Sequence, residues 1–430
     1  MPNTATSRSA LPLRAQLDQS ASRHAHATRP AGCAHAAPIP AAGRTVFRLL
    51  QRLQVGRLDV QLPDGSLRHF GTPGAQPAAL LRLHDWRACS AALKSGDIGF
   101  AEGRIQGHWS SPDLPGLLRL LNLNRERLDA VIYGSAWGRL LYRIRHALHR
   151  NSRSGSRRNI HAHYDIGNAF YRQWLDESMN YSSAWFDGQR SHPLPQAQAA
   201  KVGRALDEAR VAPGQRVLEI GCGWGAVAEA VAGERRAHLT GLTLSTEQLE
   251  FAQQRMARAG LSERTDLRLQ DYRDLSDEPF DAVVSIEMFE AVGREYWPTF
   301  FETVKRQLKP GGRACIQTIT IRDELFERYV KSTDFIQQYI FPGGLLPSPG
   351  EFSRAAARAG LVVDNTLAFG PDYAETLRRW RAGFHAQAVA IRAQGFDEAF
   401  VRTWDLYLAY CEAAFDTGST DVVQFTLRHA

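Results

Sequence analysis

The chain has 430 residues, of which 44% are hydrophobic and 23% are charged, and its formal net charge is +7. The length allows two domains and a tail, and the composition is that of an ordinary globular protein. No window approaches the roughly 18 uninterrupted apolar residues of a membrane span, and no apolar leader opens the chain, so we expect neither a spanning helix nor a secretory signal. The five cysteines are scattered without a CxxC pair, which argues against disulfides or a zinc site and favours a reducing cytoplasm.

Residues 1–44 are rich in Ala, Ser, Pro, His and Arg and nearly free of aromatic residues. This composition predicts a disordered basic tail, and the irregular histidine spacing argues against a metal site. Residues 45–130 follow as a predicted α+β accessory domain. There "RLDVQLPDGSLRHFG" (57–71) alternates apolar and polar residues on both sides of a Pro-Asp-Gly turn, which predicts a β-hairpin. No clustered nucleophile and base stands in this domain.

Residues 131–160 form a predicted basic linker or helix without Asp or Glu. In "WGRLLYRIRHALHR" (137–150), apolar residues recur at helical spacing and arginines occupy the remaining face. Such a helix lies either on an anionic membrane surface or against the protein with a solvated face, and the pattern leaves both open. The arginines of the stretch are Arg139, Arg143, Arg145, Arg150, Arg153, Arg157 and Arg158.

From about Pro213 the pattern alternates between strands and helices. Strands are predicted at 216–222, 238–244, 266–272, 280–289, 313–321, 361–369 and 422–428, and helices at 224–233, 245–260 and 296–312. A β-α-β repeat of this kind predicts a doubly wound, Rossmann-like α/β domain with a mostly parallel sheet.

The turn "EIGCGWG" (219–225) places three glycines between a strand and a helix, where the missing Cβ atoms let a ligand approach the backbone. A dinucleotide fingerprint would be G-x-G-x-x-G, whereas this turn is G-x-G-x-G with Glu219 in the preceding strand. It resembles the first motif of class I S-adenosylmethionine-dependent methyltransferases. The resemblance implies that Glu219 positions the methionine ammonium and Asp271 the adenine. The second strand ends without an acidic residue, so Thr243 and Gln248 are expected at the ribose.

The segment "HAHYDIGNAFYRQWLDESMNYSSAWF" (161–186) carries seven large aromatic residues just upstream of the glycine turn. One interpretation is a buried amphipathic helix, because Ile166, Phe170 and Trp174 recur at helical spacing. The other is a lid over the cofactor.

Together with "LEIGCGWG", "GLTLSTEQ", "MFEAVG", "YIFPGGLLPS" and "FGPDYAETL", this segment resembles the cyclopropane-fatty-acyl-phospholipid synthases and mycolic acid methyltransferases. The resemblance runs from about His161 to the C-terminus, which sets the predicted methyltransferase domain at 161–430. Residues 57–124 resemble the accessory domain of the longer, phospholipid-acting members. The cofactor-binding residues expected from these motifs are Tyr181, Ser182, Glu219, Gly221, Gly223, Gly225, Thr243, Gln248, Asp271, Tyr272 and Ile286.

The reaction that the resemblance implies leaves a carbocation on the acyl chain after an alkene takes the methyl group. Aromatic faces stabilise a cation without trapping it, and Tyr164 is expected beside the alkene. In the family a bicarbonate ion removes the proton, held by a Glu and a Tyr, which carry over to Glu290 and Tyr373. The remaining family ligands, a Cys and a His, are replaced by Ser183 and Gln317. Ser183 keeps the backbone N–H, but Gln317 cannot titrate.

The sequence therefore predicts an enzyme that adds a one-carbon unit from S-adenosylmethionine to double bonds of phospholipid acyl chains, forming a cyclopropane ring. The alternatives are a methylene- or methyl-branched product and, more distantly, a non-catalytic lipid-binding protein. A nucleic-acid methyltransferase is disfavoured because no aromatic-flanked N/D-P-P-[YF] motif or RNA-binding module is visible. We expect no metal and no nucleic-acid partner. We expect the protein to attach through anionic lipids to the inner face of the cytoplasmic membrane, and a homodimer is possible.

Overall fold

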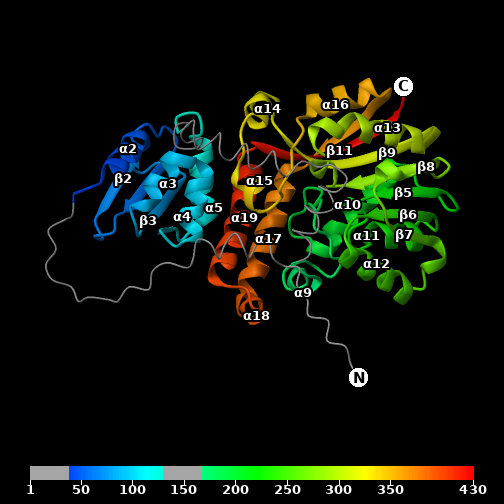
Figure 1. Cartoon of the computed structure of the whole chain (residues 1–430), viewed down its shortest axis with the longest axis horizontal. Helices are drawn as coiled ribbons and strands as arrows, with labels where there is room; N and C mark the ends of the chain where they lie inside the picture. Colours follow the sequence, from blue (N-terminus) through cyan, green and yellow to red (C-terminus); the bar gives the residue numbers. More distant parts are fainter. Residues whose placement is uncertain (1–37, 129–165) are drawn as a thin grey trace. The chain divides into compact units, whose positions relative to one another are not determined.

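The computed structural model describes residues 38–128 and 166–430, which form two compact units (Figure 1). The first unit contains the described residues up to 128 together with Ser332–Ile340 and Ile391–Thr417. The second contains residues 166–331, Phe341–Ala390 and Gly418–Ala430. The predicted basic linker at 131–160 and most of the predicted tail lie outside the described residues.

The first unit is built on a four-stranded sheet in the order β2-β1-β3-β4. Strand β1 (Arg57–Gln61) pairs antiparallel with β2 (Leu67–Gly71), which confirms the predicted hairpin, and parallel with β3 (Ala78–Leu83). The short β4 (Trp109–Ser110) completes the sheet. The helices of this part of the chain are α2 (Ala41–Leu50), α3 (Arg87–Ser95), α4 (Asp97–Ile105) and α5 (Leu114–Leu123). Helix α2 begins inside the predicted tail, so the boundary at 44 was wrong.

Two segments of the predicted methyltransferase domain belong to the first unit, which corrects the prediction of one domain over 161–430. They carry α15 (Phe335–Tyr339) and α19 (Glu398–Asp416). Asp405 of α19 pairs with Arg104 of α4 at 3.2 Å, and the Tyr339 hydroxyl donates to Glu102 at 2.6 Å. Helix α19 buries side chains all along its length, so it needs apolar partners on several sides, and α4 and α5 supply them. The chain enters this unit from the second within α18 (Ala388–Ala393).

The second unit contains a seven-stranded sheet in the order β10-β11-β9-β8-β5-β6-β7 (Figure 1). Five neighbouring strands are parallel, and the last two strands of the chain add antiparallel pairs at one edge. The predicted doubly wound α/β domain is thereby confirmed. The strands are β5 (Arg216–Ile220), β6 (His238–Thr243), β7 (Thr265–Leu269), β8 (Phe280–Ile286), β9 (Leu308–Ile321), β10 (Leu361–Ala368) and β11 (Thr420–His429).

Both faces of this sheet are covered, because alternate residues of each central strand enter different cores. Val217 packs in one apolar cluster and its neighbour Leu218 in the other, and Ala282 and Val283 divide in the same way. One cluster includes residues of α10 (Leu194–Glu208), α11 (Ala226–Glu229) and α12 (Thr246–Arg258); the other includes residues of α13 (Trp297–Gln307), α14 (Asp323–Val330) and α16 (Pro349–Arg358). Helices α9 (Asn168–Tyr171) and α17 (Gly370–Ala386) complete the α-helices of the unit's described part.

Candidate active site

A pocket lies where the carboxyl ends of β5, β6, β7 and β8 meet, which is the place where open α/β sheets bind ligands. Each strand ends in a turn that directs residues into it, and the segment 179–182 supplies a further wall. The lining residues include Met179, Asn180, Tyr181, Ser182, Glu219, Gly221, Gly223, Leu242, Thr243, Gln248, Asp271, Tyr272, Arg273, Ile286, Glu287 and Met288. Ten of the eleven predicted cofactor-binding residues are among them; the exception is Gly225.

The glycine turn follows β5 and is held by two hydrogen bonds, in which the N–H groups of Gly221 and Cys222 donate to the Leu242 carbonyl at 2.9 and 2.8 Å. Gly223 has φ +49, and a Cβ there would meet no atom within 4 Å, so it would project into open space at the pocket. Gly225 is different. A Cβ on it would lie 3.0 Å from the Cβ of Ala252, so its role is close packing against α12, and its prediction as a cofactor contact is corrected.

Glu219 is 3% exposed, and its Oε2 has no hydrogen-bond partner within residues 38–128 and 166–430. Burial raises the pKa of this carboxyl to about 8, and the positive charge of Lys201 opposes the shift. An unpaired acceptor in the wall of a pocket fits a cationic ligand group, because a buried polar atom without a partner costs roughly 1–3 kcal/mol.

The predicted ribose and adenine residues also reach the pocket. The Thr243 hydroxyl lies 3.0 Å from Oε1 of Gln248, and both side chains are buried. Asp271 follows β7 and forms an ion pair with Arg273, whose guanidinium also lies 5.2 Å from the centre of the Tyr296 ring. Arg273 was absent from the predicted site, although it stands two residues after Asp271.

Lys201 of α10 reaches the pocket wall from behind. Its side chain is 0% exposed, and its Nζ donates to the Ser182 hydroxyl at 2.6 Å and to Oδ1 of Asn180 at 3.1 Å. Burial lowers the pKa of Lys201 to about 8, and Glu287, Asp176 and Glu219 oppose that shift. This lysine positions the segment that lines the pocket, and the amphipathic pattern of α10 gave no sign of it.

The aromatic segment combines both interpretations. Phe170 and Trp174 are buried in the protein, as the packing interpretation predicted, although α9 spans only four residues. Tyr181 instead lines the pocket, as the lid interpretation predicted. Its ring centre lies 5.4 to 6.4 Å from those of Tyr171, Trp174, Phe341 and Trp380. Tyr164 lies outside the described residues.

The predicted proton-acceptor site contains a different carboxylate from the one expected. Glu287 lines the pocket directly after β8, and three groups donate to it: the Ser183 N–H at 2.8 Å, Nε2 of Gln317 at 2.8 Å and the Tyr373 hydroxyl at 2.7 Å. Glu290 instead accepts from the Ile319 N–H. Its Oε2 is buried without a hydrogen-bond partner among the described residues, and burial together with Glu287 raises its pKa to about 8.

The structure thus brings the Tyr373 hydroxyl to Glu287 and not to Glu290, and the role of Glu290 in holding an ion stays a prediction. The sequence did contain a signal for Glu287. In "SIEMFE" this residue directly follows the parallel strand β8, and ligand-binding side chains are common at the carboxyl ends of such strands. Ser183, Gln317 and Tyr373 do meet at one place, as predicted, but they meet around Glu287. In residues 38–128 and 166–430 no group of three or more His, Cys, Asp or Glu residues could hold a metal ion.

The charges around the pocket fit S-adenosylmethionine. The carboxylates of Glu219 and Glu287 line it, Glu290 stands beside Glu287, and Lys201 adds one positive charge. A ligand that carries both an ammonium and a sulfonium group would offset the negative charge, and the open space at Gly223 leaves room for it. The fold and this site define an S-adenosylmethionine-dependent methyltransferase.

Comparison with known proteins gives the family. The family model described as mycolic acid cyclopropane synthetase matches residues 151–425, so the chain belongs to that family. The chain is 39% identical to the tuberculostearic acid methyltransferase UfaA1 of Mycobacterium tuberculosis, over 91% of this chain and 92% of the other. It is 37% identical to the cyclopropane-fatty-acyl-phospholipid synthase of Escherichia coli K12, over 59% of this chain and 63% of that one.

Solved structures agree. The mycolic acid cyclopropane synthase CmaA1, complexed with SAH and CTAB, matches with a TM-score of 0.59 and 34% identity, covering 63% of this chain and 96% of that one. Coclaurine N-methyltransferase bound to SAH matches with a TM-score of 0.56 at 17% identity, over 76% of this chain and 98% of that one, and supports the fold.

We predict that Gly223→Val abolishes cofactor binding without unfolding the protein. The branched side chain would enter the open space at the glycine turn, and we expect S-adenosylmethionine affinity in calorimetry to fall by at least about 100-fold, which is roughly 2.8 kcal/mol. Gly214→Val is the matched control: Gly214 also has a positive φ (+76) and open space at its Cβ, but it is exposed outside the pocket. Equal affinity of the two variants would contradict the assignment.

We also predict that cofactor affinity rises with pH between about pH 6 and 7.5, a range in which an α-amino group keeps its proton. The pKa of Glu219 is raised to about 8, so in the free protein this carboxyl is mostly protonated there and must lose its proton to pair with an ammonium. Calorimetry in buffers of different ionisation enthalpy measures that proton release. Glu219→Gln should remove the dependence and the exposed control Glu234→Gln should keep it; a pH-independent affinity in the unmodified protein would contradict the role of Glu219.

Proposed function

We propose that this enzyme transfers a one-carbon unit from S-adenosylmethionine to the double bond of unsaturated fatty acyl chains in membrane phospholipids. The observation that supports this best is the aromatic wall beside the cofactor pocket, in which four rings surround Tyr181. S-adenosylmethionine supplies an electrophilic methyl group. The acyl double bond would form a bond to that methyl carbon as the sulfur–methyl bond breaks and S-adenosylhomocysteine leaves. The acyl chain would then carry a carbocation, which the ring faces stabilise while they exclude water.

Different residues of the pocket would bind different parts of the cofactor. Glu219, Gly221 and Gly223 would hold the methionine end, with Thr243 and Gln248 at the ribose and Asp271 at the adenine. Lys201 holds the segment of Tyr181 and Ser182 against the pocket. The geometry of the pocket and the family to which the chain belongs support these roles.

For the product we propose a methylene branch. The relative matched over nine tenths of the chain is named a methyltransferase. A 1,2-hydride shift followed by loss of a proton from the added methyl group gives a methylene branch without any reductant. A cyclopropane ring is the second candidate, because the family description and the Escherichia coli relative both name ring formation. A saturated methyl branch would require a separate reduction.

The product prediction is tested by expressing the chain in a bacterium that makes unsaturated phospholipids but lacks its own cyclopropane synthase. The ring and the methylene branch have the same mass, so the isolated acyl esters are compared by proton NMR, where vinylidene and ring-methylene protons are distinct. We expect vinylidene signals. Ring-methylene signals alone would overturn the product proposal but support the transfer, and unmodified lipids would contradict the transfer itself.

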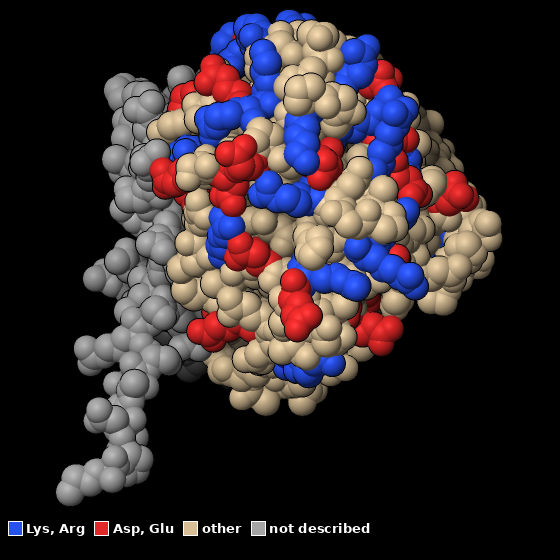
Figure 2. Space-filling model, turned by 90° about the vertical axis from the view of Figure 1, so that its right-hand side faces the viewer, with Lys and Arg blue, Asp and Glu red and all other residues tan. Residues whose placement is uncertain are grey.

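We further propose that the protein works from the surface of the membrane. Among the described helices, none is long and apolar enough to span a bilayer. On the face shown in Figure 2, basic and acidic side chains are interspersed, unlike the continuous basic stripe typical of a nucleic-acid-binding surface. The arginine-rich stretch between 139 and 158 lies outside the described residues, and each such residue near an anionic leaflet contributes about 1 kcal/mol.

Vesicle co-sedimentation tests this attachment. Binding should increase with anionic lipid content and decrease with salt, because exposed charges are screened beyond roughly 10 Å at 0.1 M ionic strength. Replacing Arg139, Arg143 and Arg145 by Gln should weaken binding to anionic vesicles, whereas Arg258→Gln, an exposed substitution on α12, should not. Equal binding to neutral and anionic vesicles at every salt concentration would remove the arginine stretch from the attachment site.

A further inference from the structure

We propose that Glu287 is the proton acceptor of the reaction and that this enzyme needs no bicarbonate. The proposal rests on the proposed function, since it concerns the step that removes a proton from the alkylated chain. It assigns to a side chain of the protein the work that the family resemblance assigned to a bound ion.

The first observation is the set of donors. The three groups expected to hold an anion, the Ser183 N–H, the Gln317 amide and the Tyr373 hydroxyl, all donate to the Glu287 carboxylate at 2.7 to 2.8 Å. The carboxylate has the charge and planar shape of bicarbonate, and it takes up the donors that an ion would need. It lines the cofactor pocket.

The second observation is the backbone of Glu287, which has φ +50. This left-handed conformation is uncommon for residues other than glycine, and where it persists at a pocket it is a candidate for a functional constraint. The conformation is held by the Glu287 N–H, which donates to the Gln317 carbonyl at 2.8 Å. A glycine would adopt it freely, yet this chain places a carboxylate there.

The third observation is a network that sets the direction of the Gln317 amide. Gln317 on β9 and Gln424 on β11 are direct cross-strand partners, and both are 0% exposed. Arg204, which can only donate, bonds to Oε1 of Gln424. The Gln424 Nε2 must then face Oε1 of Gln317 at 3.0 Å, which turns the Gln317 Nε2 toward Glu287.

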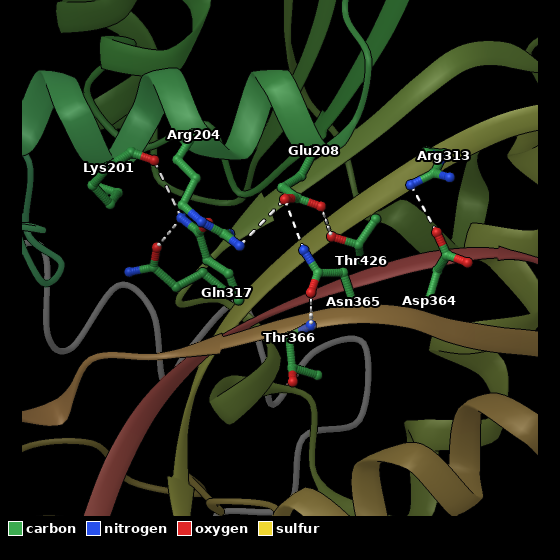
Figure 3. Close-up of polar contacts among 10 residues, drawn as sticks. Lys201, Arg204, Glu208, Arg313, Gln317, Asp364, Asn365, Thr366 and Thr426 are labelled. Carbon is green, nitrogen blue, oxygen red and sulfur yellow. Dashed lines mark hydrogen bonds and ion pairs between the residues drawn. The ribbon is translucent and has the colours of Figure 1, made fainter. Parts of the chain in front are cut away.

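Figure 3 shows part of this network, in which Lys201, Arg204 and Glu208 all come from α10. Arg204 lies between Gln317 and Glu208, and Glu208 in turn is bonded by Asn365 and Thr426. The Lys201 carbonyl accepts a second bond from Nε2 of Gln424 at 3.2 Å. The bonds of Gln424 to Arg204, Lys201 and Gln317 therefore direct the Gln317 amide N–H, and not its oxygen, to Glu287, as a carboxylate requires.

The chemistry balances without another reactant. A C–H bond of the added methyl group breaks, and an oxygen of Glu287 takes the proton. The electron pair of that bond forms the double bond of a methylene branch or the closing bond of a cyclopropane ring. The electron demand of the carbocation is met within the acyl chain, and nothing is oxidised or reduced. Solvent then removes the proton from Glu287 to restore the carboxylate for the next turnover.

The electrostatic setting supports a carboxylate of this kind. Burial raises the pKa of Glu287, while its donors and the positive charge of Lys201 oppose that shift. Burial and the charge of Glu287 raise the pKa of the neighbouring Glu290 to about 8. Glu287 accepts from three donors, whereas Oε2 of Glu290 has no partner among the described residues, so the hydrogen bonds favour the charge on Glu287.

Two substitutions at one position test the proposal. Glu287→Gln keeps the shape but cannot accept a proton, and we expect turnover to fall by at least about 100-fold, the usual scale for loss of a general base. Glu287→Gly suits the left-handed backbone and leaves the three donors for an added ion. We expect its turnover to be equally low in carbonate-free buffer and to recover at least tenfold when millimolar bicarbonate is added.

The controls separate this proposal from the proposed function. The unmodified enzyme should have the same turnover, within about twofold, in carbonate-free and bicarbonate-supplemented buffer, and Glu234→Gln should behave as the unmodified enzyme does. Because Glu287 also adds negative charge to the cofactor pocket, turnover of both Glu287 variants is compared at saturating S-adenosylmethionine, where a loss of cofactor affinity cannot account for the fall. Carbon-13 NMR of labelled bicarbonate should show binding to Glu287→Gly but not to the unmodified protein.

A fall in turnover of the unmodified enzyme in carbonate-free buffer, restored by bicarbonate, would overturn the proposal and leave the proposed function standing. Full activity of Glu287→Gln would overturn it as well. If the unmodified enzyme modified no acyl chain under any condition, the proposed function would fail first.

A pH profile distinguishes a proton acceptor from a merely structural carboxylate. Turnover should fall as pH decreases through the pKa of Glu287, because the protonated carboxyl cannot accept. Tyr373→Phe removes a donor that lowers this pKa, so the acid limb should move to higher pH. The charges of Lys201 and Glu290 interact with Glu287, and Glu219 and Asp176 act on Lys201; Tyr373→Phe leaves all four in place. An unchanged acid limb would contradict the assignment.

Discussion

The constraint on which this site depends is the placement of a carboxylate in a partly enclosed pocket. A carboxylate removed from water must be matched by donors or by opposite charge. Glu287 obtains its donors from three elements far apart in sequence: the aromatic segment through Ser183, the sheet through Gln317 and α17 through Tyr373. The bonds to Glu287 therefore join the segment that lines the cofactor pocket to β9 and α17. These bonds stabilise the shape of the pocket.

The same balance extends across the pocket. Oε2 of Glu219 in the pocket wall has no hydrogen-bond partner among the described residues. Lys201, which is bonded to Ser182 and Asn180, interacts electrostatically with both Glu219 and Glu287. The shifts in the pKa values of Glu219 and Lys201, each to about 8, arise from this shared enclosure. A positively charged cofactor would offset the negative charge at Glu219. In the proposed function, the Glu287 carboxylate would face the acyl cation. If Glu287 accepts the proton as we propose, one arrangement serves both cofactor binding and proton removal.

Local patterns in the sequence predicted most of the fold, because strand alternation, helix periodicity and the glycine turn each involve neighbouring residues. The hairpin at 57–71, the order of strands and helices after residue 213 and the position of the cofactor turn are confirmed. The contacts that decide the chemistry join distant residues. Gln317 meets Gln424 only through strand register, and Lys201 meets Ser182 only through the packing of α10. For this reason the sequence did not single out Glu287. The domain boundary was missed because it depends on where the apolar sides of α19 find partners.

The central claim, that the protein supplies its own proton acceptor, is tested most directly by crystal structures of the unmodified enzyme and of Glu287→Gly. Both would be grown with S-adenosylhomocysteine and a long-chain amphiphile in millimolar bicarbonate. We expect the unmodified enzyme to keep Glu287 between Ser183, Gln317 and Tyr373 with no ion there, and the glycine variant to hold an anion at the same three donors. An anion bound to Gln317 and Tyr373 in the unmodified enzyme, with Glu287 turned away, would contradict it.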